Sequence, residues 1–241
     1  MLYWLLFEQL QSHFSPLRIF GYLTFRVALA SLTALFLCIV LGPFLIERLR
    51  HLQIGQYIRE EGPKSHQKKA GTPTMGGVLI VISIVIATLL WANLTNPMVW
   101  IAIFSIVAYG SIGFYDDYMK VTRRRNLGLS SRKKFGLQCL IALAVCAALM
   151  VLHAQGSYTT RMNVPFFKQL RPDLLIHSLA DNWWTYPLSF AIVYLFLLIV
   201  VVGASNGVNL TDGLDGLAIG LMVIAAGALT ALTYISGHAE W

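Results

Sequence analysis

The stretch MVWIAIFSIVAYGSIGFYDDYMK, residues 98–120, joins a long apolar run to two adjacent acids. We predict a membrane span over residues 98–115, since a helix needs roughly 20 apolar residues to cross a bilayer. Asp116 and Asp117 follow at once, and Lys120 comes one helical turn later. The chain has only 11 acidic residues in 241, so two of them side by side at the end of a span require an explanation.

The composition predicts an all-α protein, a polytopic transmembrane helical bundle. Hydrophobic residues make up 57% of the chain and charged residues 12%, whereas soluble domains carry about 25% charged residues. We expect a single integral membrane domain over residues 1–241. We predict six membrane spans, at about 22–46, 75–95, 98–115, 133–153, 188–205 and 213–236.

The distribution of basic residues predicts the orientation of the spans. The segment 47–74 holds six of the 18 Lys and Arg residues and 116–134 holds seven, whereas 92–97 holds none and 154–187 holds three. Basic loops face the cytoplasm. We therefore expect the two basic segments and the short loop near 204–215 in the cytoplasm, and the N-terminus outside. Because the net charge of +7 follows this topology, it does not indicate nucleic acid as a partner.

Two of the predicted inner loops carry both polar groups and cations. The motif SHQKKAGTPTMGG, residues 65–77, offers cations and hydroxyls suited to phosphate oxygens. In the acid pair, one carboxylate can bind a hard cation or accept a proton while the other orients it, and Lys120 can neutralise both or bind a phosphate. Helix capping by Thr and local pairing of Lys120 are the structural alternatives for these two motifs.

The third inner loop holds the motif NGVNLTDGLDGLA, residues 206–218. Its Asn209, Asp212 and Asp215 have the spacing of one helix face, and such oxygen ligands suit Mg²⁺ or hydrogen bonds to a base and sugar. Acids, cations and glycine-rich backbone on one side of the membrane indicate a Mg²⁺-dependent site for a phosphorylated substrate.

The motifs KKAGTPTMGG, GFYDDYMK and NGVNLTDGLDGLA, in this order, resemble those of bacterial phospho-N-acetylmuramoyl-pentapeptide transferases. These enzymes belong to the polyprenyl-phosphate hexose-1-phosphate transferase superfamily. The stretches YLTFR, GPKSH and VPFFK extend the resemblance along the chain. The resemblance implies transfer of phospho-MurNAc-pentapeptide from UDP-MurNAc-pentapeptide to undecaprenyl phosphate, which yields lipid I and UMP in peptidoglycan synthesis. It also implies Mg²⁺ as the cofactor, contact with membrane lipid and assembly into a homodimer. The implied site lies on the cytoplasmic face of the inner membrane.

The resemblance also assigns roles to individual residues. It implies that Asp116, Asp117 and Asp212 are catalytic, with Asp117 removing the proton from the acceptor phosphate or assisting its attack. A covalent aspartate nucleophile is the alternative. Asp117, Asn209 and Asp212 are the implied metal ligands. The implied substrate-binding residues are Lys69, Thr74, Lys120, Lys133, Asn209, Asp215 and His66, the last without an assigned role.

One departure from the family bears on activity. Family members continue beyond this length, with a further aspartate and a histidine-rich loop, so we interpret the chain as an N-terminal portion and expect it to be inactive alone. Three alternatives remain open. They are a sibling UDP-HexNAc:polyprenyl-phosphate transferase, a transporter with acids at its inner mouth, and a truncated, non-catalytic membrane protein.

Overall fold

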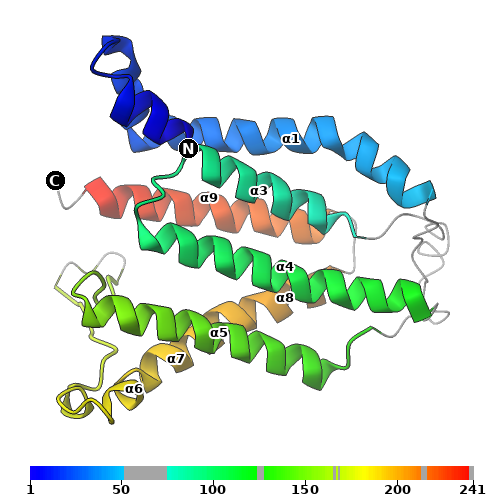
Figure 1. Cartoon of the computed structure of the whole chain (residues 1–241). Helices are drawn as coiled ribbons and strands as arrows, with labels where there is room; N and C mark the ends of the chain where they lie inside the picture. Colours follow the sequence, from blue (N-terminus) through cyan, green and yellow to red (C-terminus); the bar gives the residue numbers. More distant parts are fainter. Residues whose placement is uncertain (52–74, 124–127, 165–166, 168, 213–215, 239–241) are drawn as a thin grey trace. The chain divides into compact units, whose positions relative to one another are not determined.

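The computed structural model is helical, as the composition predicts (Figure 1). It describes residues 1–51, 75–123, 128–164, 167, 169–212 and 216–238. Within these ranges there is no β-strand, only an isolated bridge between Arg161 and Asp173. The chain divides into two compact units, Met1–Ile141 and Ala142–Trp241, and each is described by itself.

The predicted spans correspond to helical stretches, and five are long and apolar enough to cross a membrane. These five are Leu23–Leu49, Pro97–Arg123, Ser131–Ala154, Ala191–Thr211 and Leu217–Tyr234. The sixth, α3 (Gly77–Trp91), is apolar but has only 15 residues, so the predicted span 75–95 is longer than the helix. Met75 has a positive φ of 74° and Ala92 is extended, which sets these limits.

Unit 1 contains α1 (Leu23–His51), α3, α4 (Pro97–Arg123) and the first part of α5 (Ser131–Ala154). The helix α3 packs against both α1 and α4, and successive helices run antiparallel (Figure 1). The end of α4 therefore lies at the same end of unit 1 as the start of α3 and the start of α5 (Figure 1).

Specific contacts hold the helices of unit 1 together. Gly110 allows close packing of α4 on α3, because a Cβ there would be 3.0 Å from a methyl group of Val81. The hydroxyl of Tyr109 donates to the carbonyl of Gln138 at 3.2 Å, which joins α4 to α5. Asn96 caps α4 by accepting the N–H of Met98 at 2.9 Å.

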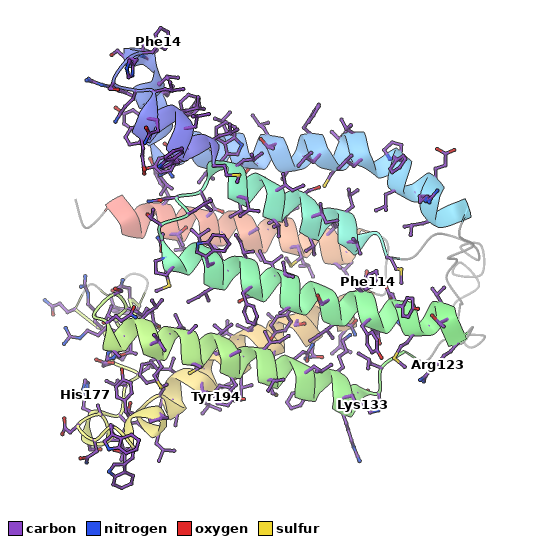
Figure 2. The ribbon with its side chains drawn as sticks, viewed as in Figure 1. Phe14, Phe114, Arg123, Lys133, His177 and Tyr194 are labelled. Carbon is purple, nitrogen blue, oxygen red and sulfur yellow. The ribbon has the colours of Figure 1, made fainter. Side chains whose placement is uncertain are left out.

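Unit 2 contains the rest of α5, then α6 (Tyr186–Ser189), α7 (Ala191–Leu197), α8 (Gly203–Thr211) and α9 (Leu217–His238). A π-helical segment, Leu198–Val202, joins α7 to α8. The core is formed by Cys146, Leu175, Phe190 and Val193. Many large apolar side chains of both units point outward (Figure 2), as expected for helices that face lipid rather than water.

Candidate functional site

The acid pair lies on the last turns of α4, with Lys120 bridging its two members. The Nζ atom of Lys120 is 2.7 Å from Oδ2 of Asp116 and 3.1 Å from Oδ1 of Asp117. Residues three and four apart share a helix face, so this contact follows directly from the spacing. The prediction that Lys120 lies beside both acids is confirmed.

Asp116 and Asp117 have different surroundings. Only 13% of the Asp116 side chain is exposed, compared with 31% of Asp117. Asp116 also accepts the backbone N–H of Leu129 at 2.7 Å, from the segment that leads into α5. Gly128 lies against it so closely that a Cβ there would be 2.8 Å from both Cγ and the backbone oxygen of Asp116. The less exposed acid therefore holds the chain in place, and the other is more open.

The first turn of α5 brings further cations to this end of unit 1. Lys133 is exposed there and is labelled in Figure 2, while Lys134 is half-buried and donates its backbone N–H to Ser130. The predicted substrate-binding residue Lys133 thus begins the helix that Leu129 leads into. Its role in phosphate binding stays a prediction.

In unit 2, Asn209 and Asp212 lie at the end of α8, and both are exposed. The prediction that Asn209, Asp212 and Asp215 share one helix face stays a prediction, because Asp215 lies outside the described residues. The helix ends at Thr211, Asp212 has a ψ of 50°, and Gly216 has a positive φ of 81° before α9 begins. The glycines of this motif favour such a break, because they have low helix propensity and adopt positive φ readily.

Four of the predicted substrate-binding residues, His66, Lys69, Thr74 and Asp215, lie outside the described residues. Within the described part, no cluster of three or more His, Cys, Asp or Glu side chains is assembled. Mg²⁺ in phosphate-transfer sites is usually bound by one or two carboxylates together with substrate phosphates. The carboxylates of Asp117, in unit 1, and of Asp212, in unit 2, are each a donor of the kind that such sites use.

Two groups of residues were missed by the sequence analysis. Gly128 and Leu129 contact Asp116 across 12 and 13 positions of sequence, and only the glycine itself indicated a close approach. In the α5–α6 segment, residues 155–185, Asp173 accepts hydrogen bonds from Thr160 and from the N–H of Leu175. No motif marked that cluster.

The fold and the site define a multi-pass helical membrane protein with paired acids and cations where a span ends. Residues 99–241 match the family model described as glycosyl transferase family 4, and residues 69–81 match the phospho-N-acetylmuramoyl-pentapeptide-transferase signature 1. The chain belongs to glycosyl transferase family 4, which confirms the resemblance drawn from its motifs.

Three curated bacterial relatives, each named phospho-N-acetylmuramoyl-pentapeptide-transferase, match along nearly all of the chain. The identity is 64% over 240 residues for Solibacter usitatus, 60% over 247 for Koribacter versatilis and 59% over 239 for Acidobacterium capsulatum. These alignments cover 100%, 100% and 99% of this chain, and 64%, 64% and 63% of the relatives. The chain therefore spans less than two thirds of the length of these relatives.

Proposed function

We propose that the protein transfers phospho-MurNAc-pentapeptide from UDP-MurNAc-pentapeptide to undecaprenyl phosphate, releasing UMP and forming lipid I. The observation that carries this proposal is the 64% identity over essentially the whole chain to a relative named for this transfer. The acid pair with Lys120 at the end of a span supports it. A lipid phosphate in the membrane has to meet a soluble nucleotide at such a boundary.

Asp117 is the candidate for the proton-removing role. Its carboxylate is the more exposed of the pair, and a general base has to come within hydrogen-bond reach of the acceptor phosphate. Lys120 balances the charge of the two acids before substrate arrives. It can then share its three N–H donors with an incoming phosphate, which reduces the repulsion between phosphate and carboxylate.

Asp117, Asn209 and Asp212 are the proposed Mg²⁺ ligands, since each offers an oxygen donor. When bound, Mg²⁺ supplies positive charge that offsets the charge of the phosphates and of the leaving UMP. Exposed Asp212 and Asn209 at the end of α8 can bind substrate oxygens or the metal without a change in helix structure.

We place the acid pair on the cytoplasmic face and the N-terminus outside. The support is the positive-inside rule, applied to the basic segments that follow α1 and α4. A homodimer is also proposed, on the resemblance alone. Cysteine labelling from either side of sealed vesicles tests the orientation. Labels at Asn93 and at Thr122, on opposite ends of unit 1, should react from opposite sides.

The function is tested by UMP release from the complete protein that carries this sequence, with UDP-MurNAc-pentapeptide and undecaprenyl phosphate. We expect Asp117→Asn to lower kcat by about 10²–10⁴-fold, the range for a lost general base. The control is Asp181→Asn, the same change at an exposed acid of the α5–α6 segment, which should retain wild-type turnover. UMP release with UDP-GlcNAc but not with UDP-MurNAc-pentapeptide would show a sibling transferase. UMP release with neither donor would refute the proposal.

A further inference from the structure

The carboxylate of Asp116 makes contacts in two directions. Within α4 it pairs with Lys120 at 2.7 Å, and outside α4 it accepts the N–H of Leu129, two residues before α5, at 2.7 Å. Hydrogen bonds to an ionised acceptor are the stronger kind. Asp116 therefore joins the end of α4 to the segment that enters α5.

Gly128 makes this junction sterically specific. A Cβ at this position would be 2.8 Å from Cγ of Asp116 and 2.8 Å from its backbone oxygen, closer than real Cβ contacts. The backbone at residue 128 can approach the acid only because glycine has no side chain. We refer to Asp116, Lys120, Gly128 and Leu129 together as the α4–α5 clasp.

We propose that Asp116 is a positioning residue, whose clasp sets the first turn of α5 and Lys120 in place beside Asp117. This inference rests on the proposed transferase function. Both oxygens of Asp116 are already engaged, Oδ1 by Leu129 and Oδ2 by Lys120. Asp117 is more exposed. Asp116 therefore holds the site in position, and Asp117 takes part in its chemistry.

On this proposal, a small disturbance of the clasp should have a large effect on the rate of transfer. Leu129 is followed closely by the first turn of α5, with Lys133 and half-buried Lys134. If the N–H of Leu129 moves, the backbone that carries these cations moves with it. Misplacement of a catalytic group by about 1 Å can cost about 10²-fold in rate.

The decisive variant is Gly128→Ala, because it disturbs the clasp and leaves both acids intact. Its matched control is Gly136→Ala in α5, where a Cβ meets no atom within 4 Å. Asp116→Ala removes the acceptor, and Asp116→Asn keeps one acceptor oxygen without adding atoms. Asp116→Asn thus serves as a second test if Gly128→Ala fails to fold. All variants are made in the complete protein and reconstituted in lipid nanodiscs.

Two measurements are made on each variant. Hydrogen exchange of the Leu129 amide reports the clasp, whether or not the protein is active. The kcat, KM and pH profile of UMP release report the chemistry. We expect Gly128→Ala and Asp116→Ala to speed exchange at Leu129 and to lower kcat by about 10²-fold, with the acidic limb of the pH profile retained. We expect Asp117→Asn to remove that limb and to leave exchange at Leu129 unchanged.

Other results would overturn the inference. If Asp116→Asn removes the acidic limb while Gly128→Ala has wild-type kcat, Asp116 is itself the proton acceptor. If neither Gly128→Ala nor Asp116→Ala alters exchange at Leu129, the clasp does not operate. Absence of UMP release from the wild-type protein, together with the expected exchange pattern, would support the clasp and refute the transferase function. The two proposals therefore fail in distinguishable ways.

Discussion

The stability of the α5–α6 segment should depend on Asp173 and therefore on pH. This segment, residues 155–185, connects α5 to α6 in unit 2. One oxygen of Asp173 accepts the hydroxyl of Thr160 at 2.5 Å and the N–H of Leu175 at 3.0 Å. The other is 3.3 Å from Nε2 of His177, which Figure 2 labels, and 3.7 Å from Nε of Arg161. The carboxylate thus joins the two stretches of backbone that are paired by the isolated bridge between Arg161 and Asp173.

The size of the effect follows from which partners are buried. Thr160 is 3% exposed and Leu175 is 8% exposed, so Asp173→Ala leaves two donors unsatisfied in a largely dry place. Each costs about 1–3 kcal/mol. Because the Asp173 side chain is 22% exposed, water can replace part of this loss. We expect a total of about 2–3 kcal/mol. The pairs with Arg161 and His177 add little, since both of those side chains are 69% exposed.

The sign of the pH dependence follows from the pKa of Asp173. Burial alone would raise this pKa, but the hydrogen bonds from Thr160 and Leu175 and the charges of His177 and Arg161 bring it below its usual value. A carboxyl with a lowered pKa stabilises the fold fully above its unfolded pKa of about 3.9. This stabilisation is lost as the pH falls through the lower, folded value. The α5–α6 segment should therefore loosen only in strong acid.

Hydrogen exchange of the α5–α6 segment tests both expectations. Asp173→Ala should speed exchange at Leu174 and Leu175 by about 30–150-fold at neutral pH, which corresponds to about 2–3 kcal/mol. Asp173→Asn keeps one acceptor oxygen, so it should have a smaller effect and should lack the acid transition. Asp181→Ala, at an exposed acid of the same segment, is the control. A change below about threefold in Asp173→Ala, or a wild-type acid transition in Asp173→Asn, would refute the reasoning.

Three further substitutions have clear expected outcomes. Phe190→Ala removes a core ring that is 2% exposed and should lower the free energy of unfolding by about 3–5 kcal/mol, measured by thermal unfolding of the purified protein. Gly21→Ala places a methyl group within 2.8 Å of the ring of Phe7, so the segment before α1 should become more sensitive to limited proteolysis. Lys120→Met leaves the acid pair without its bridging cation and should reduce UMP release far more than Arg123→Met at an exposed position of the same helix.

The fold could be predicted from the sequence because each span is a local property. An apolar run has to satisfy its backbone hydrogen bonds internally, so in lipid it forms a helix wherever it lies in the chain. The exception is α3, which is shorter than the predicted span 75–95. Its ends depend on single backbone conformations, a positive φ at Met75 and an extended Ala92, which hydropathy does not report.

The site contacts that follow from local spacing were predicted, whereas those that depend on the path of the backbone were missed. Lys120 was expected beside Asp116 and Asp117 because residues three and four apart meet on any helix. The contact of Asp116 with Leu129 depends on the path of the chain between two helices, and no spacing rule gives that path. The predicted common face of Asn209, Asp212 and Asp215 stays a prediction, since it applies helix periodicity beyond Thr211, the last residue of α8, to a residue outside the described part of the chain.

The doubled acid can now be related to the geometry of the helix that carries it. Adjacent helical residues point about 100° apart, so two neighbouring carboxylates cannot serve one point in space. Asp116 faces the approaching backbone of Gly128 and Leu129, whereas Asp117 is more exposed and pairs with Lys120. On the clasp proposal, a site without Asp116 would be badly positioned, and a site without Asp117 would lack its general base. Asp116 and Asp117 should therefore fail in different measurements when substituted, although they are neighbours in the sequence.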